Sequence, residues 1–197
     1  TTKQEIANLL YASGIAKDKI KVGNQSYNPA PSPQIFREGD MDYQVIGNNT
    51  VKVTDYRGNS NMDIVIPETV TDQSSGTTYT VTHIGSGAFG SKTITGSLFL
   101  PDTLVSIEES AFAFNQFSGS LSLPESLNTI GNYAFQKNHF TGDLTIPKNV
   151  SYIGSMAFDS AGFTGNLNIE GKPIYLEGQT FYNCGFTGTL SLPDTLT

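Results

Sequence analysis

Apolar residues recur every 23 positions through the second half of the chain. The repeat appears in three registers at once: Leu98, Leu121, Leu144, Leu167 and Leu190; Phe89, Phe112, Phe135, Phe158 and Phe181; and Gly96, Gly119, Gly142, Gly165 and Gly188. Glycine makes up only about 7% of an average protein, so its repeated return at one phase is not a chance event. The region therefore consists of internal repeats, which are expected to stack on one another.

Each repeat begins with a short strand pattern. In "GSLSLP", Leu121 and Leu123 alternate with Ser120 and Ser122, which is typical of a strand with one buried face. Pro124 follows and ends the strand, because proline has no N–H to donate to a neighbouring strand. The pattern predicts one short strand per repeat.

The rest of each repeat supplies core residues. After the strand, Leu127, Ile130 and Phe135 are expected to point inward. One unit of 23 residues is too small to bury them by itself. Coils stacked at about 4.8 Å solve this, because each Leu, Ile and Phe then covers its copy in the next coil. The repeat therefore predicts a β-rich solenoid with short parallel strands and turns.

The residues before the regular repeats predict an N-terminal β cap. "MDYQVI" and "VKVTDY" are interpreted as two strands joined at residues 47–49, and "TDQSSGTT" as a hairpin or loop within a first, irregular repeat. Solenoids need atypical ends that shield the last apolar layer. Residues 39–96 are accordingly predicted to form the cap and the first irregular repeat, and residues 97–197 the regular repeats, truncated at the C-terminus.

Residues 1–38 are predicted to form a separate helical segment followed by a linker. The helix is indicated by an apolar stripe with i, i+3 and i+4 spacing: Ile6, Leu9 and Leu10. Thr2 and Glu5 have the spacing of a capping box at the start of this helix. "YNPAPSPQIF" then contains three prolines, which favour an extended, semi-rigid linker.

The repeat also resembles a known family. The unit L-x-[LI]-P-x-x-[LV]-x-x-I-G-x-x-A-F-x-x-N-x-F-[ST]-G, read from Leu121 to Gly142, resembles the BspA-like leucine-rich repeats of bacterial surface proteins. The resemblance covers residues 63–197 and implies a curved leucine-rich-repeat solenoid with one short strand per repeat. It also implies display outside the cell and binding to proteins of a host or of neighbouring cells.

Two features depart from the family pattern. Family members often carry Cys in the turn after A-F, and the corresponding residues here are Asn115, Asn138, Ala161 and Cys184. In the copy that begins at Asn166, Glu170, Pro173 and Leu176 replace the usual Pro, apolar residue and Ile. We therefore expect this coil to be locally distorted.

Charge and composition narrow the range of partners. The chain of 197 residues has 18 acidic and 11 basic side chains, a net charge of -7, and no Lys/Arg cluster that would neutralise phosphates. It lacks the run of about 18 apolar residues that indicates a membrane helix, and "TTKQE" at its start does not resemble a signal peptide. These features argue against nucleic acid as a partner and against membrane insertion. Together with the resemblance, they predict a protein of the bacterial cell surface, outside the cell, whose signal peptide is absent from this fragment.

No set of residues predicts catalysis, a metal or a cofactor. His83 and His139 lie at different phases of the repeat, so they are not expected to form a metal pair. Cys184 occupies a turn phase with no His nearby in sequence, which favours a packed thiol over a nucleophile. The acidic stretch from Glu38 to Asp42 lacks the spacing of a calcium loop. An enzyme in the N-terminal segment is disfavoured because that segment lacks His, Cys and acidic clusters.

Outward residues of the stacked strands form the candidate binding surface. They lie in three columns: Ser97, Ser120, Asp143, Asn166 and Thr189; Phe99, Ser122, Thr145, Asn168 and Ser191; and, after the bend, Ser106, Thr129, Tyr152 and Tyr175. These residues are either ordinary solvent-facing β residues or a shallow hydrogen-bonding face for a protein loop or a glycan. In the second interpretation Phe99 is an anchor, and the two tyrosines either form a recognition patch or only stack.

These observations predict an extracellular protein-interaction or adhesion module. Two alternatives stay open, a passive stalk or spacer and a glycan-binding module attached to a larger surface protein. The final "LSLPDTLT" begins another copy without its second half, so we expect the natural chain to continue past Thr197. For the fragment itself we expect a monomer, or weak end-to-end association through the C-terminal edge.

Overall fold

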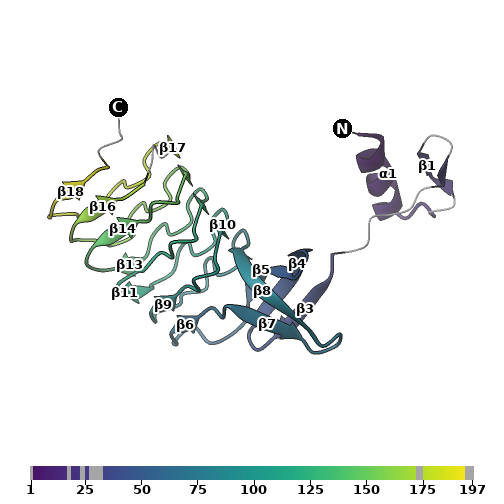
Figure 1. The fold of residues 1–197 in the computed structure, drawn as a ribbon, viewed down its shortest axis with the longest axis horizontal. Coiled ribbons are helices and arrows are strands. Elements are labelled where there is room, and N and C mark those ends of the chain that lie inside the picture. The colour runs from purple at the N-terminus through teal and green to yellow at the C-terminus, as the bar shows by residue number, and fades with distance from the viewer. Residues whose placement is uncertain (1, 17–18, 23–24, 27–32, 172–174, 194–197) are drawn as a thin grey trace. The chain divides into compact units, whose positions relative to one another are not determined.

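The structure is a computed structural model that describes residues 2–16, 19–22, 25–26, 33–171 and 175–193. The chain divides into two compact units, Thr1–Gln34 and Ile35–Thr197. Each unit has its own cluster of buried apolar residues. Figure 1 shows the elements of both units.

The first unit contains one helix and one pair of short strands. They are α1 (Lys3–Ala12), β1 (Lys21–Val22) and β2 (Gln25–Ser26), with β1 and β2 antiparallel. The predicted capping box is present, because the Thr2 hydroxyl accepts the Glu5 N–H while the Glu5 carboxylate accepts the Thr2 N–H. These contacts satisfy backbone donors that a helix start leaves free.

The apolar stripe expected on this helix is not the buried face. Three side chains of the stripe remain exposed: Ile6, Leu9 and Leu10. The buried residue of the helix is Ala7, which packs with Ile20 and Val22. The small side chain at position 7 lets the segment that leads into β1 approach the helix.

The boundary between the units differs from the predicted one by four residues. Residues 35–38, which the sequence assigned to the N-terminal segment, form strand β3 (Ile35–Glu38) in the second unit and pair antiparallel with the next strand. Most of the predicted proline-rich linker, residues 27–32, lies outside the described residues.

The second unit starts with antiparallel hairpins, as the sequence predicted for residues before the repeats. Strand β4 (Met41–Gly47) pairs with β5 (Thr50–Tyr56), and β7 (Thr69–Asp72) pairs with β8 (Thr77–Ile84). Strands β5 and β8 then pair in parallel, which joins the hairpins to the stacked coils.

The coils contribute two sets of short parallel strands. One set continues the sheet of the hairpins, here called the long sheet: β10 (Ser106–Ile107), β12 (Thr129–Ile130), β15 (Tyr152–Ile153) and β17 (Tyr175–Leu176). The other set, here called the split sheet, consists of two separate groups: β6 (Ile64–Val65) with β9 (Leu98–Phe99), and β14 (Leu144–Ile146) with β16 (Leu167–Ile169) and β18 (Leu190–Ser191). Between them, β11 (Ser118–Gly119) pairs with β13 (His139–Phe140). Pairing partners are 23 residues apart in all regular coils, as in Leu144 with Leu167, which confirms the repeat register.

The strand expected at Leu121–Leu123 is absent. Both side chains point to the core and are buried, but this segment pairs with neither β9 nor β14. By contrast, the coil expected to be distorted is regular where it is described: β16 pairs with β14, and β17 pairs with β15. Pro173, the strongest reason for expecting distortion, lies outside the described residues.

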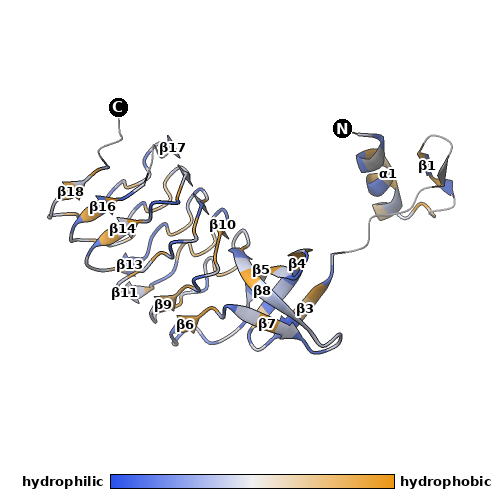
Figure 2. Cartoon of the chain, in the orientation of Figure 1, coloured by the Kyte–Doolittle hydropathy of each residue, from blue (hydrophilic) through white to orange (hydrophobic). Residues whose placement is uncertain are grey.

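Stacked aromatic rings fill the core of the coils. The first column runs from Tyr56 through Phe89, Phe112, Phe135, Phe158 and Phe181, with ring centroids 5.1–5.6 Å apart. The second column contains Phe117, Phe140, Phe163 and Phe186 at 5.5–6.1 Å, and its rings meet the first column edge-on. Figure 2 shows the corresponding pattern on the ribbon, with hydrophobic colour along the short strands and polar colour in the turns. The Phe phase predicted as core is therefore confirmed.

Buried asparagines hold the turns after the A-F motif. The Asn138 side-chain amide donates to the carbonyls of Phe112 (3.0 Å) and Phe135 (2.9 Å), and its oxygen accepts the Phe117 N–H at 3.3 Å. Asn115 makes the same contacts one coil earlier, donating to the Phe89 carbonyl at 2.7 Å. The sequence analysis noted this phase but did not predict that the asparagines are buried and satisfy backbone groups of two coils.

Candidate functional site

Side-chain oxygens close the ladder of the split sheet at three places. The Asp63 carboxylate accepts the Ser97 N–H at 2.8 Å, the Asp143 carboxylate accepts the Asn166 N–H at 2.7 Å, and the Asn166 amide oxygen accepts the Thr189 N–H at 2.8 Å. We call each contact a clamp. Each one joins the residue just before a strand to the same position in the next coil, and in all three cases the two strands that follow are paired.

Serine stands at the clamp position in the two remaining coils. Between the coils that follow Ser97 and Ser120 the strands are not paired, and no backbone hydrogen bond joins residues 120–123 to either neighbouring coil among the described residues. A serine hydroxyl reaches less far than a carboxylate or an amide, so it leaves the next N–H without this partner. The presence of Asp or Asn, as opposed to Ser, therefore coincides with a closed ladder at all five junctions.

The glycine before each clamped N–H follows the same division. Gly119 and Gly142, which follow the serine coils, have φ of +76° and +78°. Gly165 lies so close to the Asp143 carboxylate that a Cβ would clash with it, and Gly188 lies equally close to Asn166. The clamp and the close approach of the backbone therefore occur together.

The unpaired segment lines a hollow of about 290 Å3 in the split sheet. Its walls are residues 120–123 on one side and Asp143, Thr145 and Pro147 on the other, with Glu125 and Glu170 at its margin. Four residues predicted for binding meet here: Ser120, Ser122, Asp143 and Thr145. The sequence analysis placed them in regular columns, whereas the structure collects them around a gap between two groups of strands. We call this region the gap.

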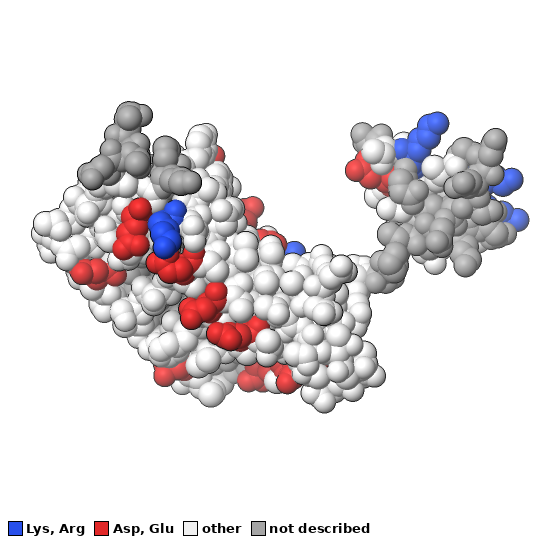
Figure 3. All heavy atoms as spheres, viewed as in Figure 1, with Lys and Arg blue, Asp and Glu red and all other residues white. Residues whose placement is uncertain are grey.

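The gap is acidic. Glu125, Asp143 and Glu170 line it, and no basic side chain does. Lys148 forms a contact of 3.8 Å with Glu125, but both side chains are well exposed, so the pair neutralises the region only weakly. Hydrogen bonds from the backbone and the side chain of Asn166 lower the pKa of Asp143, which stays ionised at neutral pH. Figure 3 shows acidic side chains in red over the region of β14 and β16, with little blue among them.

An exposed apolar pair lies in the coils before the gap. Phe99 is 53% exposed and its strand partner Val65 is 63% exposed, although both sit within paired strands. Phe99 lies one repeat before Ser122, so the aromatic ring and the gap belong to neighbouring coils of the same face. Phe99 was predicted as an anchor residue. Val65 was missed because it lies in the irregular first repeat, where no outward column was assigned.

The other predicted binding residues lie elsewhere or are already engaged. Asn166 forms a clamp, and Asn168 donates to Glu170 at 3.1 Å. Tyr152 and Tyr175 belong to the long sheet, where their rings stack with centroids 5.9 Å apart and Tyr175 is 64% exposed. The nine predicted residues therefore do not form one continuous site.

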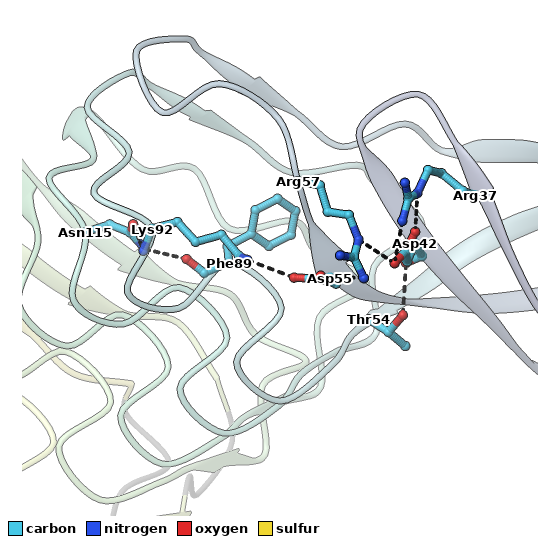
Figure 4. Close-up of polar contacts among 8 residues, drawn as sticks. All are labelled: Arg37, Asp42, Thr54, Asp55, Arg57, Phe89, Lys92 and Asn115. Carbon is cyan, nitrogen blue, oxygen red and sulfur yellow. Dashed lines mark hydrogen bonds and ion pairs between the residues drawn. The ribbon is translucent and has the colours of Figure 1, made fainter.

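The acidic stretch before β4 is occupied by ion pairs. The Asp42 carboxylate contacts Arg37 at 2.6 Å and Arg57 at 2.9 Å, and the hydrogen bond from Arg37 is the main cause of its lowered pKa. Asp55 pairs in turn with Lys92 at 2.8 Å (Figure 4). These contacts join the cap to the first coil.

The histidines and the cysteine are placed as structural residues. His83 lies in β8 beside Thr82, and burial lowers its pKa. The Cys184 thiol donates to the Phe158 carbonyl at 3.0 Å, in the turn position that asparagine occupies in earlier coils, and burial raises its pKa. Among the described residues, no group of three or more His, Cys, Asp or Glu side chains is arranged to hold a metal ion. In the same part of the chain, no helix has the length and hydrophobicity needed to span a bilayer.

Several solved structures of leucine-rich repeat proteins are similar to this chain. The pneumococcal vaccine antigen PcpA matches with a TM-score of 0.61 and 16% identity over 80% of this chain and 46% of that one. The T. pallidum leucine-rich repeat protein matches with a TM-score of 0.51 and 20% identity over 85% of this chain and 83% of that one. A leucine-rich repeat protein from Bacteroides capillosus matches at 0.46 and 24% identity, over 80% and 99% of the two chains. This chain therefore spans less than half of the pneumococcal protein. No curated protein matches the chain.

The family itself is established from the sequence. The pattern of the BspA type leucine rich repeat region matches residues 63–187 in six copies, which is more than half of the chain. The matched residues contain all the short parallel strands from β6 to β17 and both aromatic columns as far as Phe186. The chain belongs to the BspA-type leucine-rich repeat family.

Proposed function

We propose that this chain is a protein-interaction module of a bacterial surface protein and that it binds its partner through the split sheet. The observation that carries the proposal is the combination of an exposed anchor, Phe99, with the gap in the neighbouring coils. Aromatic side chains next to less energetic polar positions are typical of binding hot spots. A solenoid presents such a surface on a rigid support, because each coil is fixed by its neighbours.

Display outside the cell, in an adhesion role, is part of this proposal. The family is one of repeats known from bacterial surface proteins, and one similar solved protein is described as a vaccine antigen. The net charge of -7 suits a solvent-exposed protein without affinity for nucleic acid.

A binding screen with matched variants tests the proposal. The purified chain is applied to arrays of extracellular-matrix proteins and of glycans, together with the Phe99→Ala and Thr145→Arg variants of the split sheet and the Tyr175→Ala variant of the long sheet. We expect a protein ligand whose binding is lost in the first two variants and kept in the third. Loss of binding only in Tyr175→Ala would contradict the assignment to the split sheet.

A glycan-binding module is the second candidate. Its support is the exposed ring of Tyr175, which stacks on Tyr152 and offers a flat apolar surface. In the same screen this function predicts glycan binding that depends on Tyr175. A passive stalk predicts no saturable ligand, with every surface variant equivalent.

A further inference from the structure

We propose that the gap is a docking site for an extended, basic peptide segment of a partner protein, which pairs with the free backbone of the gap. The inference rests on the proposed function and names the class of partner and the mode of binding. It is carried by three features of the same region: unpaired backbone groups, uncompensated negative charge and a hollow.

Backbone groups supply the first part of the argument. The N–H and C=O groups of residues 120–123 make no hydrogen bond within the described structure. The gap is flanked by two sheet edges, since β9 pairs only with β6 and β14 only with β16. Backbone donors and acceptors need partners, and an extended peptide beside an open edge provides them by adding a strand.

Charge selects the kind of peptide. Glu125, Asp143 and Glu170 line the hollow without a basic residue among its walls. Lys or Arg side chains complement this charge, whereas Asp or Glu side chains are repelled by it. An acidic or neutral peptide could use the backbone groups but would lack the electrostatic contribution, so the partner segment is basic.

Space and an apolar contact complete the site. The hollow of about 290 Å3 is large beside the share of about 30 Å3 that one water takes in the liquid, so a side chain of the peptide fits where water now stands. Phe99, in the adjacent coil, offers an apolar surface to a neighbouring side chain of the same peptide.

Three labelled octapeptides test backbone pairing and charge separately. They are an alternating Lys-Val peptide, an alternating Glu-Val peptide, and the Lys-Val peptide with N-methylated backbone, each titrated by fluorescence anisotropy at low salt. We expect saturable binding of the Lys-Val peptide and at least about tenfold weaker binding of both others, because one repels the carboxylates and the other cannot donate backbone hydrogen bonds. Equal binding of the Lys-Val peptide and its N-methylated form would overturn the pairing mode.

Variants locate the binding. Glu125→Gln and Glu170→Gln should each weaken the Lys-Val peptide about two- to fivefold, which is the range of exposed ion pairs. Glu109→Gln removes an equal charge from an exposed carboxylate that does not line the hollow and should change nothing. Hydrogen exchange at the Leu121 and Leu123 amides should slow when the Lys-Val peptide is added. Equal effects of all three Gln variants, or unchanged exchange, would place the peptide elsewhere.

The outcome separates this inference from the function it rests on. If a matrix protein binds in a Phe99-dependent way but no Lys-Val peptide binds, the split sheet is a binding face and the basic-strand mode is wrong. If the peptide binds at the gap while the screen finds only a Tyr175-dependent ligand, the proposed function fails and the peptide site stands by itself.

Discussion

Individual side chains in this protein act mainly across coils. Asn138 contacts carbonyls of its own coil and of the preceding one, and Asp143 contacts the backbone of the following coil. Each such residue replaces a ladder bond or closes a turn that the backbone alone would leave open. The stability of the solenoid at the residue scale therefore depends on a few polar side chains as well as on the Phe and Leu phases.

Replacing Asn138 tests the buried asparagines. Asn138→Ala leaves buried carbonyls and one N–H without partners, so we expect the free energy of unfolding to fall by about 1–3 kcal/mol. Asn128→Ala, at an exposed position, serves as the control and should stay within about 0.5 kcal/mol of the native protein. Urea denaturation of the three proteins measures both values, and equal losses would show that burial of Asn138 does not matter.

The clamp at Asp143 makes part of the stability dependent on pH. Its pKa is lowered below 3.8 in the folded protein, so the carboxylate stabilises the fold at higher pH, and this contribution is lost as the pH falls through the lowered pKa. Asp143→Asn keeps an oxygen acceptor that cannot titrate, as in the natural clamp of Asn166. We expect the urea midpoints of the two proteins to differ less at about pH 2 than at about pH 6. A difference that does not change with pH would mean that Asp143 titrates normally.

At the scale of elements, the closed and open parts of the split sheet follow from one position of the repeat. Asp or Asn at this position accompanies paired strands, and Ser accompanies unpaired ones. The long sheet has no such interruption between β8 and β17 among the described coils. The gap is therefore a local property of the coils that contain Ser97 and Ser120.

Installing the missing clamps should close the gap. In Ser97→Asp and Ser120→Asp, the new carboxylate is expected to accept the N–H of the next coil and to allow the adjacent strands to pair. Each added hydrogen bond contributes about 0.5–1.5 kcal/mol, so the double variant should raise the unfolding midpoint. Asp at position 122, in the outward column beside the clamp, is a matched control without a backbone partner within reach. Stability that is equal in clamp and control variants would refute the account of the gap.

The sequence predicted the register of the elements but not the gap. Because the repeat keeps 23 residues without insertion, the partners of β10, β12 and β15 could be named in advance. Asp143 and Ser120 were both assigned as outward polar residues, since a column assignment does not show which side chain reaches the backbone of the next coil. Pairing over such a distance depends on side-chain length and on the φ of the following glycine, and periodicity contains neither. The buried face of α1 was wrong for a similar reason, because Ala7 is buried through its small size and not through its place in an apolar stripe.

At the scale of the whole molecule, the last described coil leaves apolar side chains exposed. Leu190 and Leu192 are 61% and 49% exposed, and β18 has a partner on one side only, β16. An apolar surface beside an unpaired strand edge favours association with another copy. We propose that this fragment self-associates weakly through that coil.

Sedimentation velocity tests this association. The native chain should show a concentration-dependent increase in sedimentation coefficient, and Leu190→Lys with Leu192→Lys should abolish it, because the charges oppose edge-to-edge pairing. Leu9→Lys with Leu10→Lys, at exposed positions of α1, is the control for general hydrophobicity. A strict monomer at high concentration, or an effect of the control alone, would contradict an association site at β18.

The binding of the Lys-Val peptide to Ser120→Asp tests the central claim most directly, namely that the gap itself is the recognition site. The substitution adds a negative charge, so a site that depended on charge alone would bind the basic peptide more tightly. Closure of the gap removes the free backbone groups and the hollow, and the account therefore predicts at least about tenfold weaker binding in fluorescence anisotropy. Unchanged or stronger binding by Ser120→Asp would contradict it.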